Sequence, residues 1–139
     1  MRKSTIIAVL AAAFIAPTLH AADVTEAEYQ KAMKDVLAGA QAIGKALKEG
    51  NGDLSGAVAG AKAVDAALAS LDSFWAARKD AEAQKMNTAT RDAAKAVVKA
   101  AESKDAVATE EARKALQGSC RPCHDAHREQ LPDKSYKIK

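Results

Sequence analysis

The sequence predicts an all-α protein built as an antiparallel four-helix bundle. Alanine dominates the chain after residue 21, and alanine favours helix because its side chain loses no rotational entropy on ordering. In that part of the chain prolines occur only at Pro122 and Pro132, and runs of β-branched or aromatic residues are absent. Four amphipathic segments joined by short connections favour an up-down bundle without strands.

The first helix is predicted to start at Thr25, because Thr25 and Glu28 have the spacing of a capping box. Glycines in residues 50–52 are expected to end it. Between these limits apolar residues recur every three or four positions, as a single buried stripe requires. This stripe consists of Met33, Val36, Leu37, Ala40, Ile43, Gly44 and Leu47.

The second helix is predicted to run from Asp53, as its N-cap, to about Leu71. Gly56 and Gly60 lie one turn apart on this helix, and glycine allows another backbone to approach closely. That approach would occur either within the bundle or in a homodimer. The apolar stripe of the helix consists of Val58, Ala61, Val64, Leu68 and Leu71.

The third helix is predicted to follow a turn at Asp72–Ser73 and to continue to about Glu102. A break nearer Lys79–Asp80 is the alternative. Its inner side is expected to carry Met86, Ala89, Ala93, Ala96, Val97 and Ala100.

The fourth helix is predicted to begin near Thr109, whose hydroxyl can act as an N-cap ahead of two glutamates that favour the positive end of the helix dipole. It is expected to end before Pro132, because proline cannot continue a helix. Residues 133–139 are predicted to form an extended appendage.

The first residues have the layout of a secretory signal peptide. Arg2 and Lys3 precede an apolar run over residues 6–15, and small residues around Ala21 and Ala22 supply a cleavage zone. The apolar run is too short to span a bilayer, although an uncleaved anchor is the alternative.

We therefore expect a signal peptide over residues 1–21, one domain over residues 22–139, and a periplasmic location without a membrane anchor after cleavage. The 21 lysines and arginines are interspersed with 18 acidic residues, which gives a formal net charge of +3. This pattern is typical of a solvated helical surface and does not indicate a nucleic-acid partner.

A C-x-x-C-H motif lies in the fourth predicted helix, formed by Cys120, Cys123 and His124. This spacing indicates covalent attachment of one haem c, because two thiols three residues apart can reach two vinyl groups on one porphyrin edge, and the next histidine can bind the iron. A redox dithiol would need a βαβ context. A zinc site would need two further Cys or His ligands, and only His127 is at hand after signal cleavage.

In this motif and its helical setting the chain resembles the class II c-type cytochromes, the cytochrome c′ superfamily. The run from Cys123 to Arg128 matches the family pattern Cys-His-Asp-x-aromatic-Arg, with His127 at the aromatic position. The resemblance implies that Cys120 and Cys123 form thioether bonds and that His124 is the proximal iron ligand. Arg128 would either flank the proximal haem face or a propionate, or be an ordinary surface arginine.

The sixth iron ligand divides this family. His127 lies three residues after His124 on the same helix and cannot reach the opposite haem face, which leaves Met33 and Met86 as thioether candidates. Met33 is favoured because residues 28–34 resemble the distal-ligand region of the family. A blocked or open site, with Met33 as simple core filling, is the alternative.

With His124 and Met33 as iron ligands, the resemblance implies a non-enzymatic protein that transfers single electrons to transient redox partners. With an open iron it implies a five-coordinate cytochrome c′ that binds NO or CO. Class II relatives often form dimers through their first two helices, so a homodimer is a further expectation of the same resemblance.

Overall fold

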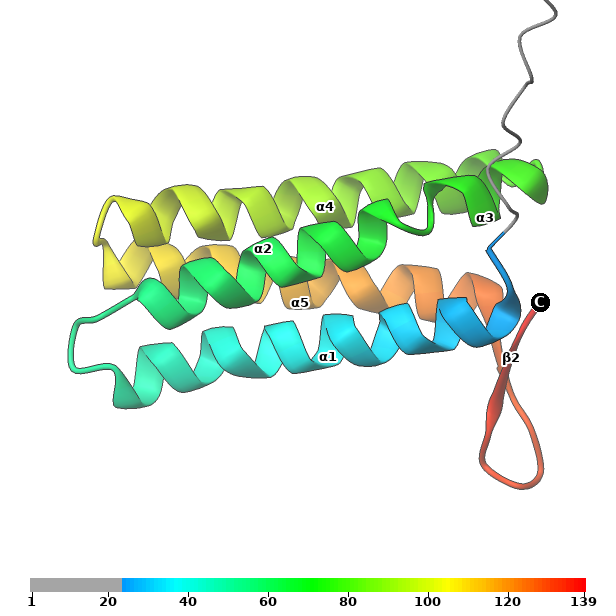
Figure 1. The fold of residues 1–139 in the computed structure, drawn as a ribbon, viewed down its shortest axis with the longest axis horizontal. Helices are drawn as coiled ribbons and strands as arrows, with labels where there is room; N and C mark the ends of the chain where they lie inside the picture. Colours follow the sequence, from blue (N-terminus) through cyan, green and yellow to red (C-terminus); the bar gives the residue numbers. More distant parts are fainter. Residues whose placement is uncertain (1–23) are drawn as a thin grey trace, which may run out of the picture.

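In the computed structural model, residues 24–139 are described, and they form a bundle of four long helices (Figure 1). The predicted signal peptide lies outside these residues. The all-α class is confirmed, and no helix within the described range is long and apolar enough to cross a membrane. The helices are α1 (Glu26–Glu49), α2 (Ser55–Ala69), the short α3 (Asp72–Ala77), α4 (Ala81–Glu102) and α5 (Ala106–His127).

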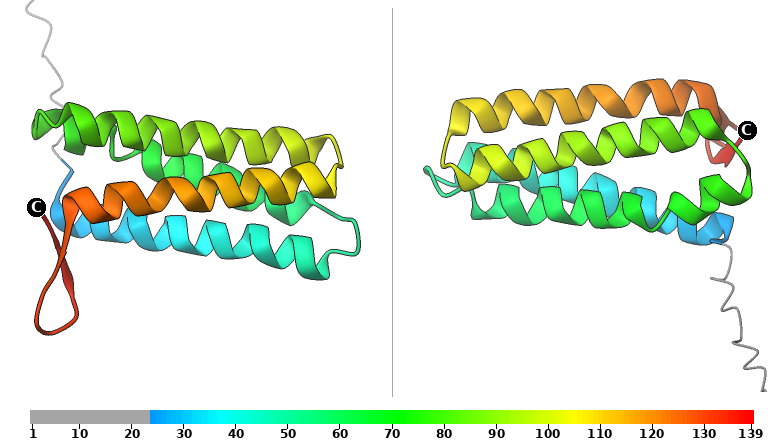
Figure 2. Two further views of the ribbon diagram at one scale, coloured as in Figure 1. Left: turned by 180° about the vertical axis from the view of Figure 1, so that it is seen from behind. Right: turned by 90° about the horizontal axis from the view of Figure 1, so that it is seen from above.

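The long helices lie side by side in the order α1, α2, α4, α5 and alternate in direction (Figure 2). The α1–α2 loop and the α4–α5 turn lie at one end of the bundle. The start of α1, the short α3 and the end of α5 lie at the other (Figure 1). Residues far apart in the sequence therefore meet at this second end, which carries the C-x-x-C-H motif.

The predicted capping box of α1 is confirmed. The Thr25 hydroxyl accepts a hydrogen bond from the Glu28 amide at 3.2 Å, and the Glu28 carboxylate accepts one from the Thr25 amide at 2.7 Å. The helix ends at Gly50 as predicted, and Asn51 and Gly52 then adopt positive φ angles of 45° and 92°.

The start of α2 is one residue later than predicted, because Leu54 and not Asp53 is the N-cap. The Asp53 carboxylate instead accepts a hydrogen bond from the Ser55 amide at 2.9 Å. It therefore closes the turn before the helix.

The predicted turn at Asp72–Ser73 is wrong, and the alternative break near Lys79–Asp80 is confirmed. Asp72 begins α3, and the chain reverses after it, where Lys79 has a φ of 55°. The Asp80 side chain then caps α4 by accepting a hydrogen bond from the Ala83 amide at 2.9 Å.

The predicted start of α5 at Thr109 is also wrong. The helix begins at Ala106, where Asp105 is the N-cap and accepts a hydrogen bond from the Ala108 amide at 2.9 Å. Thr109 lies one turn inside the helix, fully buried, and its hydroxyl donates to the Asp105 carbonyl at 2.6 Å. Lys104, with a φ of 58°, supplies the turn before the cap.

The prediction of no strands is wrong, because the segment after α5 folds into an antiparallel β-hairpin. Its strands are β1 (Arg128–Gln130) and β2 (Tyr136–Ile138), and Arg128 pairs with Ile138. The Leu131 amide donates to the Ser135 carbonyl at 2.8 Å within the loop. We call residues 128–139 the hairpin segment.

The glycines of α2 pack within the bundle. A Cβ atom at Gly60 would lie 2.6 Å from the carbonyl oxygen of Gly39, and one at Gly56 would lie 3.1 Å from the Ala46 side chain. The backbones of α1 and α2 are thus in close contact, and this contact accounts for both glycines without a second copy of the chain. The core around them includes the fully buried Ile43, Val64, Leu71, Trp75 and Val97.

Candidate haem-attachment site

The C-x-x-C-H motif occupies the last two turns of α5. Cys120 and Cys123 are free thiols, and both are half-buried. The Cys120 thiol donates a hydrogen bond to the Leu116 carbonyl at 3.4 Å. The helix continues through Pro122 to His127, so both thiols and the His124 imidazole are carried by one continuous helix.

Burial disfavours the charged forms of the two thiols and of the imidazole. Burial raises the pKa of the Cys120 thiol, and burial followed by the charges of Cys120 and Asp80 raises that of Cys123. Burial, and then the charge of Arg128, lowers the pKa of His124. A neutral imidazole is the form that binds a metal ion.

The start of α1 lies beside the motif. Burial raises the pKa of Tyr29, and the nearby charge of Cys123 raises it further. Met33 follows Tyr29 by four residues on the same helix, is half-buried, and packs against the core. Because residues four apart share one helix face, Met33 lies on the face that Tyr29 presents at this end of the bundle.

A groove of about 580 Å³ separates α1 from α5, beginning one turn from Cys120. Leu37 and Ala40 line it from α1, and Leu116 and Gln117 line it from α5. Leu37 was expected on the buried stripe but is 59% exposed, because α1 packs against α2 and makes few contacts with α5. The groove extends from this point away from the motif, and its polar lining includes Lys45, Lys48 and Arg113. The exposed leucine is an apolar surface at the end of the groove nearer the motif.

Arg128 contacts both the end of α5 and the rest of the hairpin segment. Its backbone amide bonds to the His124 carbonyl, and its guanidinium carbon lies 4.0 Å from the centre of the Tyr136 ring. Its charge reaches His124, since it contributes to the lowered pKa of that imidazole.

A cluster around the buried His127, next to the motif, was not predicted from the sequence. His127, 9% exposed, lies with Nδ1 3.2 Å from Oδ2 of Asp80 and with its ring centre 5.4 Å from that of Trp75. Trp75 in turn contacts Tyr29. Within the described residues, His127 Nε2 is the buried side-chain polar atom without a hydrogen-bond partner. Its place at an aromatic position of the resembled pattern was the available signal for burial.

Met86, the other methionine candidate, is half-buried on α4. The structure therefore carries the two candidate thioethers on different helices. Only Met33 lies on the helix whose Tyr29 packs against Trp75, which in turn packs against His127 of α5.

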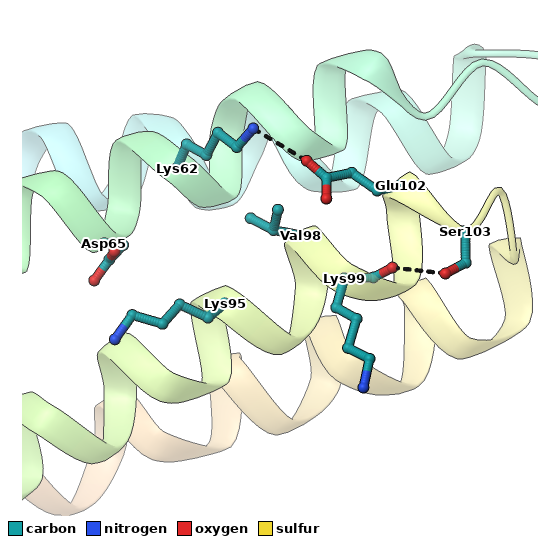
Figure 3. Close-up of a pocket in the computed structure, with 7 residues that line it drawn as sticks. All are labelled: Lys62, Asp65, Lys95, Val98, Lys99, Glu102 and Ser103. Atoms are coloured by element: carbon teal, nitrogen blue, oxygen red, sulfur yellow. Dashed lines mark hydrogen bonds and ion pairs between the residues drawn. The ribbon is translucent and has the colours of Figure 1, made fainter.

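A second cavity, of about 540 Å³, lies between α2 and α4 (Figure 3). It lies toward the end of α4, away from the motif. The Lys62–Glu102 ion pair crosses it at 3.1 Å, and Val98 is its one apolar side chain. A site lined in this way suits water and ions better than a porphyrin. The lining residues are Lys62, Asp65, Lys95, Val98, Lys99, Glu102 and Ser103.

Residues 24–139 contain no group of three His, Cys, Asp or Glu side chains placed to hold a metal ion. Haem iron does not need such a group, because the porphyrin supplies four nitrogen ligands and the protein adds one or two. No protein family, curated protein or solved structure matches the chain. Comparison with known proteins therefore gives no information on the site.

Proposed function

We propose that this chain is an exported c-type cytochrome that carries one haem c on α5 and transfers single electrons. The observation that supports it most is that one continuous helix carries two free, half-buried thiols and a half-buried imidazole in C-x-x-C-H order. Each thiol can add across one vinyl group, so that sulfur forms a thioether bond and the proton ends on the vinyl carbon.

When bound, haem supplies an iron that accepts and releases one electron. His124 would hold that iron from α5, and Cys120 and Cys123 would fix the orientation of the ring. Leu37 and Leu116 would exclude water from its apolar faces. Arg128 would keep a positive charge near the proximal imidazole.

Met33 is the proposed sixth ligand, acting from α1. It stands one turn from Tyr29, which contacts the aromatic cluster beside the motif. A thioether is a soft ligand and favours ferrous iron, which raises the reduction potential relative to a second nitrogen ligand. Two protein ligands would also hold the iron site rigid while an electron is exchanged. The redox partner would bind only transiently, through a small and polar interface.

A gas-binding cytochrome with five-coordinate iron is the second candidate, and one observation favours it. The groove between α1 and α5 is open, and Leu37 follows Met33 by one turn, so a small ligand could enter beside an apolar residue. Catalysis is the weaker proposal, because α1 carries neither a histidine to act as a distal acid or base nor a distal arginine.

The test is the optical spectrum of the purified protein, oxidised and reduced, compared with Met33→Ala and with Met86→Ala as matched control. We expect a low-spin spectrum with a methionine–iron charge-transfer band that only Met33→Ala abolishes. A high-spin spectrum unaffected by either substitution, with rapid CO binding to the reduced protein, would support the gas-binding candidate instead. A protein purified from a haem-attaching host without covalent haem would overturn both.

A further inference from the structure

The hairpin segment supplies hydrogen-bond donors to the last turn of α5. A helix leaves its final carbonyl groups without partners inside the helix. Here the Arg128 amide bonds to the His124 carbonyl, and the Lys139 ammonium bonds to the Asp125 carbonyl at 3.0 Å. The Lys139 amide bonds to the His127 carbonyl at 3.0 Å. The turn that contains His124 is thus capped by residues from both ends of the hairpin segment.

The hairpin segment is itself anchored to the bundle. Ile138 packs against the hydrophobic core, and its amide donates to the Glu26 carboxylate at 3.4 Å. The second strand is therefore held between the first turn of α1 and the last turn of α5. Figure 1 shows the hairpin at this end of the bundle.

Tyr136 holds the Arg128 side chain. The guanidinium carbon lies 4.0 Å from the centre of the tyrosine ring, which is a cation–π contact. The Gln130 amide donates to the Tyr136 hydroxyl at 3.1 Å and fixes the ring. This role accounts for a large aromatic side chain that is 42% exposed.

We propose that the hairpin segment is a positioning element for His124, in which Lys139 fixes the last turn of α5 and Tyr136 holds the Arg128 guanidinium at the end of that helix. The inference rests on the proposed function, because it takes His124 as the iron ligand. Arg128 follows His124 by four residues, and its amide bonds to the His124 carbonyl. A positive charge held at this end of α5 would disfavour the extra charge of ferric iron, so we expect the Arg128–Tyr136 contact to raise the reduction potential.

The potential of the haem-containing protein tests the charge. We expect Tyr136→Leu to lower it in the same direction as Arg128→Gln, and Tyr136→Phe to leave it unchanged because the ring remains. The double variant Arg128→Gln with Tyr136→Leu should be no lower than Arg128→Gln alone. An unchanged potential in Tyr136→Leu would overturn the role of the tyrosine.

Amide hydrogen exchange tests the capping without reference to the iron. Loss of one helix-end hydrogen bond of about 1 kcal/mol should speed exchange in the last turn of α5 roughly fivefold. We expect this in Lys139→Met and not in Lys137→Met, which removes only the exposed ion pair of Lys137 with Glu129. Equal exchange in both variants would overturn the capping role.

The two tests separate the inference from the proposed function. A protein without haem would end the proposed function and, with it, the positioning of an iron ligand, whatever the exchange rates show. A haem protein ligated by His124, whose potential and exchange rates ignore these substitutions, would overturn the inference alone.

Discussion

The imidazole of His127 and the carboxylate of Asp80 lie within ion-pair distance, with Nδ1 3.2 Å from Oδ2. The other oxygen of the same carboxylate caps α4 by accepting a hydrogen bond from Ala83. One side chain therefore joins the start of α4 to the end of the helix that carries the cysteine motif. The His127 ring also packs against Trp75, so its contribution combines packing with a polar contact.

Replacing His127 separates these two contributions. We expect His127→Ala to destabilise the fold by about 2–4 kcal/mol, because it leaves a cavity beside Trp75. His127→Phe should cost less than half as much, since it keeps a ring there and removes the buried Nε2 that has no partner. Urea unfolding measures both. Equal losses in the two variants would mean that the Asp80 contact outweighs the packing.

The close contact of α1 with α2 predicts opposite effects at two glycines. Gly60→Ala would place a methyl group 2.6 Å from the Gly39 carbonyl oxygen, and we expect a loss of about 1–3 kcal/mol from overpacking. Gly44→Ala meets no atom within 4 Å and should stabilise the helix by up to about 1 kcal/mol. Thermal unfolding of both variants checks the signs, and a stabilised Gly60→Ala would contradict the contact.

Covalent attachment predicts a graded loss of haem. Cys120→Ser with Cys123→Ser should abolish haem staining after denaturing electrophoresis, and either single variant should retain one thioether bond. The double variant should also lose helical content, because the porphyrin would supply apolar area that covers residues such as Leu37. Arg121→Gln, at an exposed position inside the motif, is the matched control and should stain normally.

The capping box of α1 predicts an acid-sensitive contribution to stability. Hydrogen bonds from the Thr25 backbone and then from its side chain lower the pKa of Glu28 from its ordinary 4.5. The unfolded chain thus binds more protons, so this contribution is present above pH 4.5 and is lost as the pH falls through the lowered folded value. Glu28→Gln should therefore reduce the fall in melting temperature below pH 4.5, whereas Glu82→Gln is the control from the first turn of α4. An identical acid profile for Glu28→Gln and the parent protein would exclude this role.

Helix ends that depend only on residues close together in the sequence were predicted correctly. The Thr25–Glu28 capping box and the end of α1 at Gly50 each depend on a few adjacent residues, and both are confirmed. The start of α5 was missed because Asp105 and Thr109 are both good N-caps, and burial of Thr109 in the bundle decides between them.

Features that depend on distant residues were not predictable in the same way. The hairpin lacks an Asn-Gly or Asp-Gly turn and is held by contacts of Ile138 and Lys139 with α1 and α5. Leu37 is exposed because α1 packs closely against α2, where Gly39 lies against Gly60. The order of Cys120, Cys123 and His124 was visible in the sequence, but the pairing of the buried His127 with Asp80 depends on the fold.

The order in which this molecule can be assembled follows from the uneven packing of α1. Its backbone is in close contact with α2, yet few contacts join it to α5 across the groove. The seam between α1 and α5 can therefore separate while the α1–α2 pair stays intact. Because both thiols are half-exposed, an enzyme that attaches the proposed haem could reach them while the α1–α2 pair is formed and the seam is open. The haem would then enter from the side and complete the folding of the bundle.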